Sequence, residues 1–418
     1  MSNPSQLEAS DDDAGNLAKT QYGDGSSPTS GNVDGPKWNL ASVLMTAVAE
    51  PSDFIQQLAI QNQLLSCLKW LSEFQVLACI PLDGSISTEE IADLVCLPET
   101  QVARVVRMTA TAGFLHEPQP GHFAHTALST PFVTNLAYLD AAMFLAETAA
   151  PAALHMADAT HKCYYGKKET AYSAAFPASQ NFPSACVKRA KLQRQWLAYR
   201  QCVGDVDDDV TKLLARLKWR SLGNACIVDA CAQSTDAAVA LAETHPSLRF
   251  VVQLIDSRSD CSGHEDVFGG RISVQNRAPA AAQVVKNAAV YIVRISSQVA
   301  PLPAQILDEL NAHVDVLRTN PSSTLVLALS VLPEPSDFGP VVEAKARMRD
   351  LYRFQLTNQY RIGLEDVLGI IQSASDGEGR LVVASTMRCT ESPTVVLGIR
   401  YQGYQGRNLA AEQARLRI

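Results

Sequence analysis

The sequence contains no pair of cysteines at CxxC spacing, although ten cysteines are scattered along its 418 residues. No secretory hydrophobic stretch follows Met1, so we predict reduced thiols inside a cell rather than a disulfide scaffold. Two pairs of potential metal ligands occur, His122 with His125 and His161 with Cys163. Neither has a second pair at zinc spacing, and we therefore predict no metal site.

Positive charge and long apolar runs are also scarce. The 35 Lys and Arg residues are outnumbered by 43 Asp and Glu residues, which gives a net charge of −8. This balance argues against a general affinity for nucleic acid or for an anionic membrane surface. The most apolar long stretch, 137–159, contains Asp140, Glu147 and Asp158. We therefore expect core helices there, and no membrane contact.

The composition is that of a folded chain with two or three domains, since 47% of the residues are apolar and 19% are charged. Residues 1–36 are the exception, because they have almost no large apolar side chains with which to offset the loss of chain entropy. We predict a disordered tail over 1–36, a winged-helix module of the dimerisation type over 37–135, a helical connector over 136–204 and an α/β domain over 205–418.

The winged-helix prediction rests on a series of local signals. Apolar residues recur at helical spacing over 53–78, with Asp53 as the expected N-cap. Ser87 and Glu90 have capping-box spacing and open a short helix, and Gly113 ends the helix that follows. The turn at 120–121 then separates two short strands. Three helices followed by a hairpin are typical of a winged helix.

A winged helix suggests DNA binding, but the charge of this module disfavours it. Residues 52–135 contain three basic residues against eight acidic ones. The expected recognition helix offers only Arg104 and Arg107 to the phosphates. We predict contact with protein, as a homodimer, and no direct DNA binding. Direct DNA reading remains the less favoured alternative.

The connector carries a cluster of basic residues over 186–200. It is either a face for nuclear import or partner binding, or the solvated side of an amphipathic helix, and the second interpretation is favoured. The basic residues are Lys188, Arg189, Lys191, Arg194 and Arg200.

The last half of the chain alternates between strand and helix patterns. This alternation predicts a doubly wound, mostly parallel sheet, with the last two strands paired as an antiparallel hairpin across 391–393. The expected helices are 237–244, 304–317 and 342–360. The seven expected strands are 226–229, 248–255, 271–275, 289–295, 324–332, 380–386 and 394–400.

The stretch 226–235 reads as a buried strand that ends at Asp229, then a turn, then a helix that starts near Thr235. In an α/β domain this is where a nucleotide-type ligand binds. A cofactor loop needs glycines there so that the backbone can turn sharply and approach the ligand. Residues 230–234 contain no glycine. The strand and the helix start of a cofactor site are therefore present, but the glycines that such a site needs are missing.

The order of a winged helix and a seven-stranded α/β domain resembles the plant and fungal O-methyltransferases that use S-adenosylmethionine. The resemblance covers about residues 52–400 and implies the class I methyltransferase fold. The segments that carry it are 219–229 (WRSLGNACIVD), 245–253 (HPSLRFVVQ), 331–335 (VLPEP), 349–352 (RDLY) and 364–366 (LED).

The sequence departs from that family at the residues that do chemistry. The acid that holds the ribose of the cofactor is replaced by Leu254, with Asp256 two residues further on. The histidine that acts as general base is replaced by Gln298, whose amide cannot accept a proton near neutral pH. Arg361 stands closest to the place of the acid that orients the base. We therefore expect no catalytic residue, no cofactor-binding residue and no bound cofactor.

Two further segments, 58–83 (LAIQNQLLSCLKWLSEFQVLACIPLD) and 113–122 (GFLHEPQPGH), are similar to one fungal group. These are the transcriptional co-activators encoded in aflatoxin-type and related anthraquinone polyketide gene clusters. The resemblance implies a non-catalytic protein that acts with a zinc-binuclear-cluster transcription factor in the nucleus, with the cytoplasm as a second location. The alternative is an active S-adenosylmethionine-dependent O-methyltransferase of a phenolic polyketide.

Overall fold

A computed structural model describes residues 50–164, 169–204, 208–232, 234–254, 265–267, 269–295, 302–335, 337–390 and 392–404. The tail expected over 1–36 lies outside these residues. The described chain forms two compact units. The helical unit holds residues 50–204 together with Gly339–Gln359, and the α/β unit holds 208–338 and 360–404. Gly339–Gln359 thus pack with the helical unit, although the sequence analysis placed them in a domain over 205–418.

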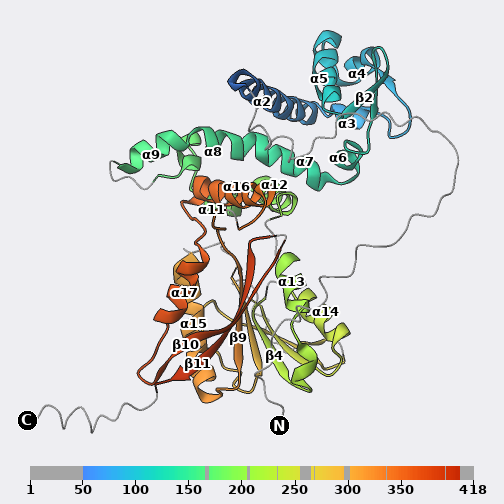
Figure 1. Ribbon diagram of the computed structural model, residues 1–418. Helices are drawn as coiled ribbons and strands as arrows, with labels where there is room; N and C mark the ends of the chain where they lie inside the picture. The colour runs from blue at the N-terminus through green and yellow to red at the C-terminus, as the bar shows by residue number, and fades with distance from the viewer. Residues whose placement is uncertain are drawn as a thin grey trace, which may run out of the picture. The chain divides into compact units, whose positions relative to one another are not determined.

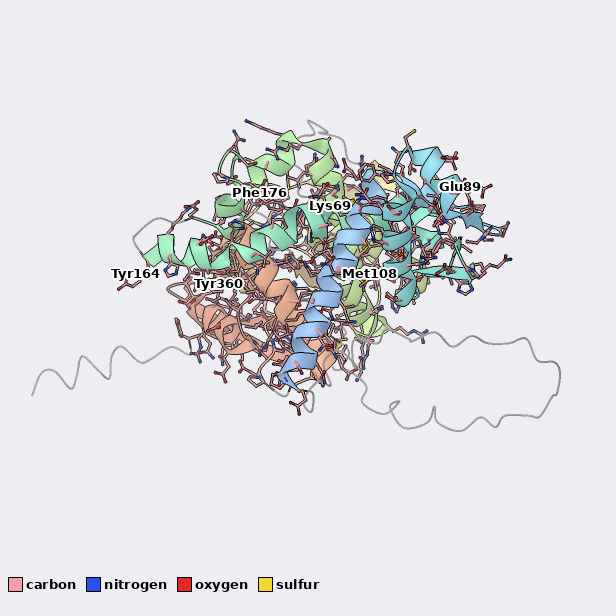
Figure 2. The ribbon with its side chains drawn as sticks, turned by 90° about the horizontal axis from the view of Figure 1, so that it is seen from above. Lys69, Glu89, Met108, Tyr164, Phe176 and Tyr360 are labelled. Atoms are coloured by element: carbon pink, nitrogen blue, oxygen red, sulfur yellow. The ribbon has the colours of Figure 1, made fainter. Side chains whose placement is uncertain are left out.

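The helical unit begins with a helical cluster and a small sheet whose strand order is β1-β3-β2. Figure 2 labels Lys69 on the long helix α2, Met108 on the helix that packs against α2, and Glu89 on a further helix of this cluster. The elements are α2 (Pro51–Glu73), α3 (Val76–Cys79), β1 (Ile86–Ser87), α4 (Thr88–Val95), α5 (Glu99–Thr111), β2 (Leu115–Gln119) and β3 (His122–His125).

Local signals explain most of these boundaries. Ser87 and Glu90 form the predicted capping box, because the Ser87 hydroxyl accepts from the Glu90 amide and the Glu90 carboxylate accepts from the Ser87 amide. Gly113 follows α5 with φ +68°, as expected of a helix end. The predicted N-cap at Asp53 is wrong: α2 begins at Pro51, because proline is favoured in a first helical turn. The winged-helix dimerisation role of this region stays a prediction.

The rest of the helical unit is built around an aromatic core. The Phe144 ring lies 5.0 Å from that of Tyr199 and 5.2 Å from that of Trp196, and Trp196 lies 5.7 Å from Tyr352. The helices are α6 (Thr130–Thr134), α7 (Leu136–Phe144), α8 (Ala150–Leu154), α9 (Met156–Tyr164), α10 (Ala171–Ala175), α11 (Phe182–Lys188), α12 (Ala190–Cys202) and α16 (Pro340–Thr357), with a π-helical turn at Leu145–Ala149.

Two of the basic residues of α12, Lys191 and Arg194, are engaged with acids of the same unit, and Arg200 lies over the Trp196 ring. Arg194 pairs with Asp140 at 2.6 Å, and Lys191 pairs with Glu147 at 3.5 Å. These contacts favour the interpretation of this face as the solvated side of a helix. Within the ranges described above, no helix is long and apolar enough to cross a membrane.

The α/β unit contains one sheet with the strand order β10-β11-β9-β8-β4-β5-β7-β6. The five central strands are parallel, and β11 pairs antiparallel with both β9 and β10, which confirms the predicted hairpin. The strands are β4 (Cys226–Ala232), β5 (Arg249–Leu254), β6 (Glu265–Val267), β7 (Ile272–Asn276), β8 (Val290–Arg294), β9 (Thr324–Ser330), β10 (Gly379–Arg388) and β11 (Thr394–Gly403).

All seven predicted strands are present, and the predicted α/β fold class is confirmed. Residues 265–267 add the short strand β6, which the sequence analysis missed because its Glu-Asp-Val sequence has no apolar alternation. Helices cover both faces of the sheet (Figure 1). α15 (Leu302–Thr319) and α17 (Leu364–Ser373) pack on one face, and α13 (Asp208–Ala215) and α14 (Asp236–Thr244) pack on the other.

Candidate functional site

The strand β4 runs through the position at which a cofactor loop would lie. The prediction that it ends at Asp229 is wrong, since the strand continues to Ala232. Ala230 and Ala232 are fully buried, and Cys231 is 6% exposed. The pairing of β4 with β5 shifts register between Asp229 and Ala232. Without a glycine to allow a sharp turn, the chain remains extended, and small side chains fit the crowded interior.

Arg277 fills the space beside this end of β4. It follows β7 directly, and its Nη1 donates to the Ala230 carbonyl oxygen at 3.1 Å and to Glu309 Oε2 at 2.9 Å. The two side chains are only 5% and 7% exposed. The Arg277 Nε also donates to the Ala281 carbonyl oxygen at 3.1 Å. The Arg277 side chain therefore bonds the carbonyl oxygen at the strand end that a ligand could otherwise have used.

The ion pair extends into a buried polar network on α15. Glu309 Oε1 accepts from the Ala280 amide at 2.8 Å. His313 Nδ1 lies 2.7 Å from the Glu309 carbonyl oxygen, which can only accept, so this nitrogen carries the proton. The neutral ring can then accept at Nε2 from Gln283, 3.4 Å away, and Gln283 also exchanges two hydrogen bonds with Gln253. Burial lowers the pKa of His313 to about 4, which agrees with a neutral ring.

Asp229 is also committed to an internal partner. Its side chain is 4% exposed and forms an ion pair with Arg294 at the end of β8. Burial raises the pKa of the Asp229 carboxyl, and the Arg294 guanidinium opposes that rise. Among the described residues, none forms a hydrogen bond with Asp229 Oδ1. The pair links two neighbouring parallel strands, which is a structural role.

Of the other positions at which the sequence departs from the methyltransferase pattern, the structure describes Leu254 and Arg361. Leu254 is the last residue of β5, and its side chain cannot bond a ribose hydroxyl. Arg361 is 8% exposed, and its Nη1 donates to the Ser330 hydroxyl at 2.9 Å. Asp256 and Gln298 lie outside the described residues. Across the part of the chain that the structure describes, no group of three or more His, Cys, Asp or Glu residues could hold a metal ion.

The buried network was not predicted from the sequence, although the sequence contains one signal of it. Glu309 and His313 are four residues apart, so they share one face of a helix that is otherwise apolar there. Charged residues on a buried helical face are expected to have partners. The partner Arg277 could not be named, since 32 positions separate it from Glu309.

Comparison with known proteins gives close relatives. No family model matches the sequence. A transcriptional coactivator of Pseudocercospora fijiensis is 53% identical over 348 residues, which cover 82% of this chain and 97% of that protein. The monodictyphenone cluster transcriptional coactivator of Emericella nidulans is 41% identical, with 87% of each chain covered. The dothistromin biosynthesis regulatory protein of Dothistroma septosporum is also 41% identical, with 86% of each chain covered.

Solved structures with the same fold have much less similar sequences. The complex of LepI with SAM superposes with a TM-score of 0.64 at 16% identity and covers 87% of this chain and 92% of that one. The mitomycin 7-O-methyltransferase MmcR superposes with a TM-score of 0.61 at 16% identity and covers 84% and 98%. These likenesses show a methyltransferase-type fold and no more. The family is shown by the relatives above: the chain belongs to the family of fungal transcriptional coactivators of secondary-metabolite gene clusters.

Proposed function

We propose that this chain is a non-catalytic transcriptional coactivator of a fungal gene cluster for an aromatic polyketide. The coactivators of Pseudocercospora fijiensis and Emericella nidulans support this role by their similarity. The observation that carries the non-catalytic part is the end of β4, where Ala230 is buried and its carbonyl oxygen is bonded to Arg277. At the described end of β4, the Ala230 carbonyl oxygen is therefore not available to hold a cofactor.

The proposed mode of action is contact with a DNA-binding partner of the zinc-binuclear-cluster type in the nucleus. The chain itself has a net charge of −8. In the helical unit, Arg107 forms an ion pair with Glu117 at 3.0 Å, so one of the two cations on the expected recognition helix is already neutralised. DNA binding would then be left to the partner, and the coactivator would contribute protein surface.

This function is tested with a reporter gene under a promoter of the same cluster. We expect the zinc-cluster factor to raise transcription more when this chain is co-expressed than when it acts alone. The purified chain should also capture the purified factor. In calorimetry the chain should release no heat with S-adenosylmethionine, under conditions in which LepI serves as the positive control.

Two results would contradict the proposal. The first is an unchanged reporter signal when the chain is present at levels equal to those of the factor. The second is micromolar binding of S-adenosylmethionine together with methyl transfer to a phenolic polyketide, which would support an active O-methyltransferase instead.

We further propose that the chain forms a homodimer through α2. Phe54, Ile55 and Leu58 on this helix are 50%, 63% and 48% exposed, which is unusual for a cluster of large apolar side chains. Light scattering after size exclusion should give the mass of a dimer, and the double variant Ile55→Asp/Leu58→Asp should give a monomer. Leu154→Asp on α8, which is 83% exposed, is the matched control and should remain dimeric. A wild-type monomer at micromolar concentration would refute this arrangement.

A further inference from the structure

A cavity of about 210 Å³ lies within the α/β unit, away from β4. The segment after β9, the first turns of α17 and the connection between β10 and β11 form its walls, with Val331, Leu368 and Val395 among the apolar residues. Sites for drug-sized ligands and cofactors usually have volumes of roughly 300–1,000 Å³. The cavity is therefore small for a nucleoside cofactor but large enough for one or two amino-acid side chains.

The walls of this cavity are held in place by backbone hydrogen bonds. The Val331 amide donates to the Pro393 carbonyl oxygen at 2.9 Å, and the Leu332 amide donates to the Ile362 carbonyl oxygen at 2.9 Å. Pro393 and Val395 are buried, which anchors the hairpin side of the cavity. A pre-formed cavity binds a side chain without first having to order its own walls, and such preorganisation favours affinity.

The rim of the cavity is acidic. Among the described residues that line it, the charged ones are the acids Glu334, Asp337 and Glu365 and one cation, Arg388, and all four are exposed. Asp337 Oδ2 accepts from the Glu334 amide at 3.2 Å, which fixes the turn that presents both carboxylates. An apolar floor with carboxylates at the mouth suits a Lys or Arg side chain. Its methylene groups would pack on the floor while its charged head pairs at the rim.

We propose that this acidic-rimmed pocket docks a Lys- or Arg-bearing segment of the DNA-binding partner. The proposal rests on the function proposed above. A protein that binds DNA must carry Lys and Arg to neutralise phosphates, so such a partner has basic segments available. The pocket and the net charge of −8 on this chain both complement that chemistry. Long-range attraction between opposite charges would speed the association of the two proteins. The methylene groups of the Lys or Arg side chain, buried in the pocket, would set the specificity.

The test uses the full-length chain and the purified zinc-cluster factor encoded in the same gene cluster. We expect the double variant Glu334→Lys/Glu365→Lys to bind the factor at least about tenfold more weakly than the wild type. The salt dependence of the remaining binding should also be smaller. Both positions are exposed, so the fold should be retained, and circular dichroism checks this.

The matched control is Glu243→Lys/Asp315→Lys, which changes the net charge equally at two exposed positions of α14 and α15 outside the pocket. It should bind the factor like the wild type. The pocket is refuted if the Glu334→Lys/Glu365→Lys variant keeps full affinity, or if the control loses as much affinity as that variant does. In both cases the wild type still binds the factor, and the coactivator function stands. Absence of binding by the wild type would refute both proposals.

Discussion

Replacing Glu309 with alanine is expected to lower the free energy of unfolding of the α/β unit by roughly 3–5 kcal/mol. The reason is that Arg277, with its side chain 5% exposed, would keep its charge in the interior without the carboxylate 2.9 Å away. The Ala280 amide would lose its acceptor as well. Urea unfolding followed by hydrogen exchange in the peptides of β4 and α15 measures the loss in this unit alone.

The matched control lies on the same helix. Asp315 pairs with Arg318 at 2.8 Å, but the Asp315 side chain is 83% exposed, so Asp315→Ala should cost less than about 1 kcal/mol. The double variant Arg277→Met/Glu309→Leu should recover much of the lost stability, because apolar residues of similar volume often replace a buried ion pair well. Equal losses of unfolding free energy for Glu309→Ala and Asp315→Ala would show that the buried pair of Arg277 with Glu309 does not stabilise the sheet at the end of β4.

Acidification should destabilise the α/β unit through His313. Burial lowers the pKa of this histidine from 6.5 to about 4, so the unfolded chain takes up a proton in a range where the folded chain does not. The stability is therefore present above pH 6.5 and is lost as the pH falls toward 4. One group shifted by this amount accounts for about 3 kcal/mol, at 1.36 kcal/mol for each pH unit. Urea unfolding at a series of pH values checks this.

The contribution of His313 is isolated by comparison with His313→Gln, whose stability should fall less steeply over the same pH range. His245→Gln provides the control in the same unit. His245 is only half-buried, and burial also lowers its pKa, so its removal should flatten the pH dependence much less. If the wild type and His313→Gln lose stability in parallel between pH 6.5 and 4, the histidine is not held neutral by its surroundings.

These two predictions concern the same structural feature. In the α/β unit, the carboxyl end of the central strand β4 is closed by residues from the end of β7 and from α15 rather than left open. The ion pair of Asp229 with Arg294 closes the side toward β8. A ligand at this place would have to break hydrogen bonds of buried charged groups, at a cost of several kcal/mol. These contacts support the proposal that the methyltransferase-type fold of this chain acts through its surfaces.

The sequence by itself determined the kind and order of the elements. The strands expected over 248–255 and 289–295 are present as β5 and β8, and both segments are rich in the apolar residues that parallel strands bury on both faces. The capping box at Ser87 and Glu90 and the glycine at 113 were also visible locally. The lack of glycine over 230–234 was evident as well, since a missing residue type does not depend on the fold.

Only the tertiary structure decided what replaced the missing loop. Arg277 and Ala230 are 47 positions apart, and hydrophobic periodicity reports which face of an element is buried, never which distant side chain meets it. The extension of β4 to Ala232 likewise depends on partners in β5 and on burial by the surrounding side chains. The grouping of Gly339–Gln359 with the helical unit has the same origin, because Tyr352 completes an aromatic core formed by residues more than a hundred positions earlier.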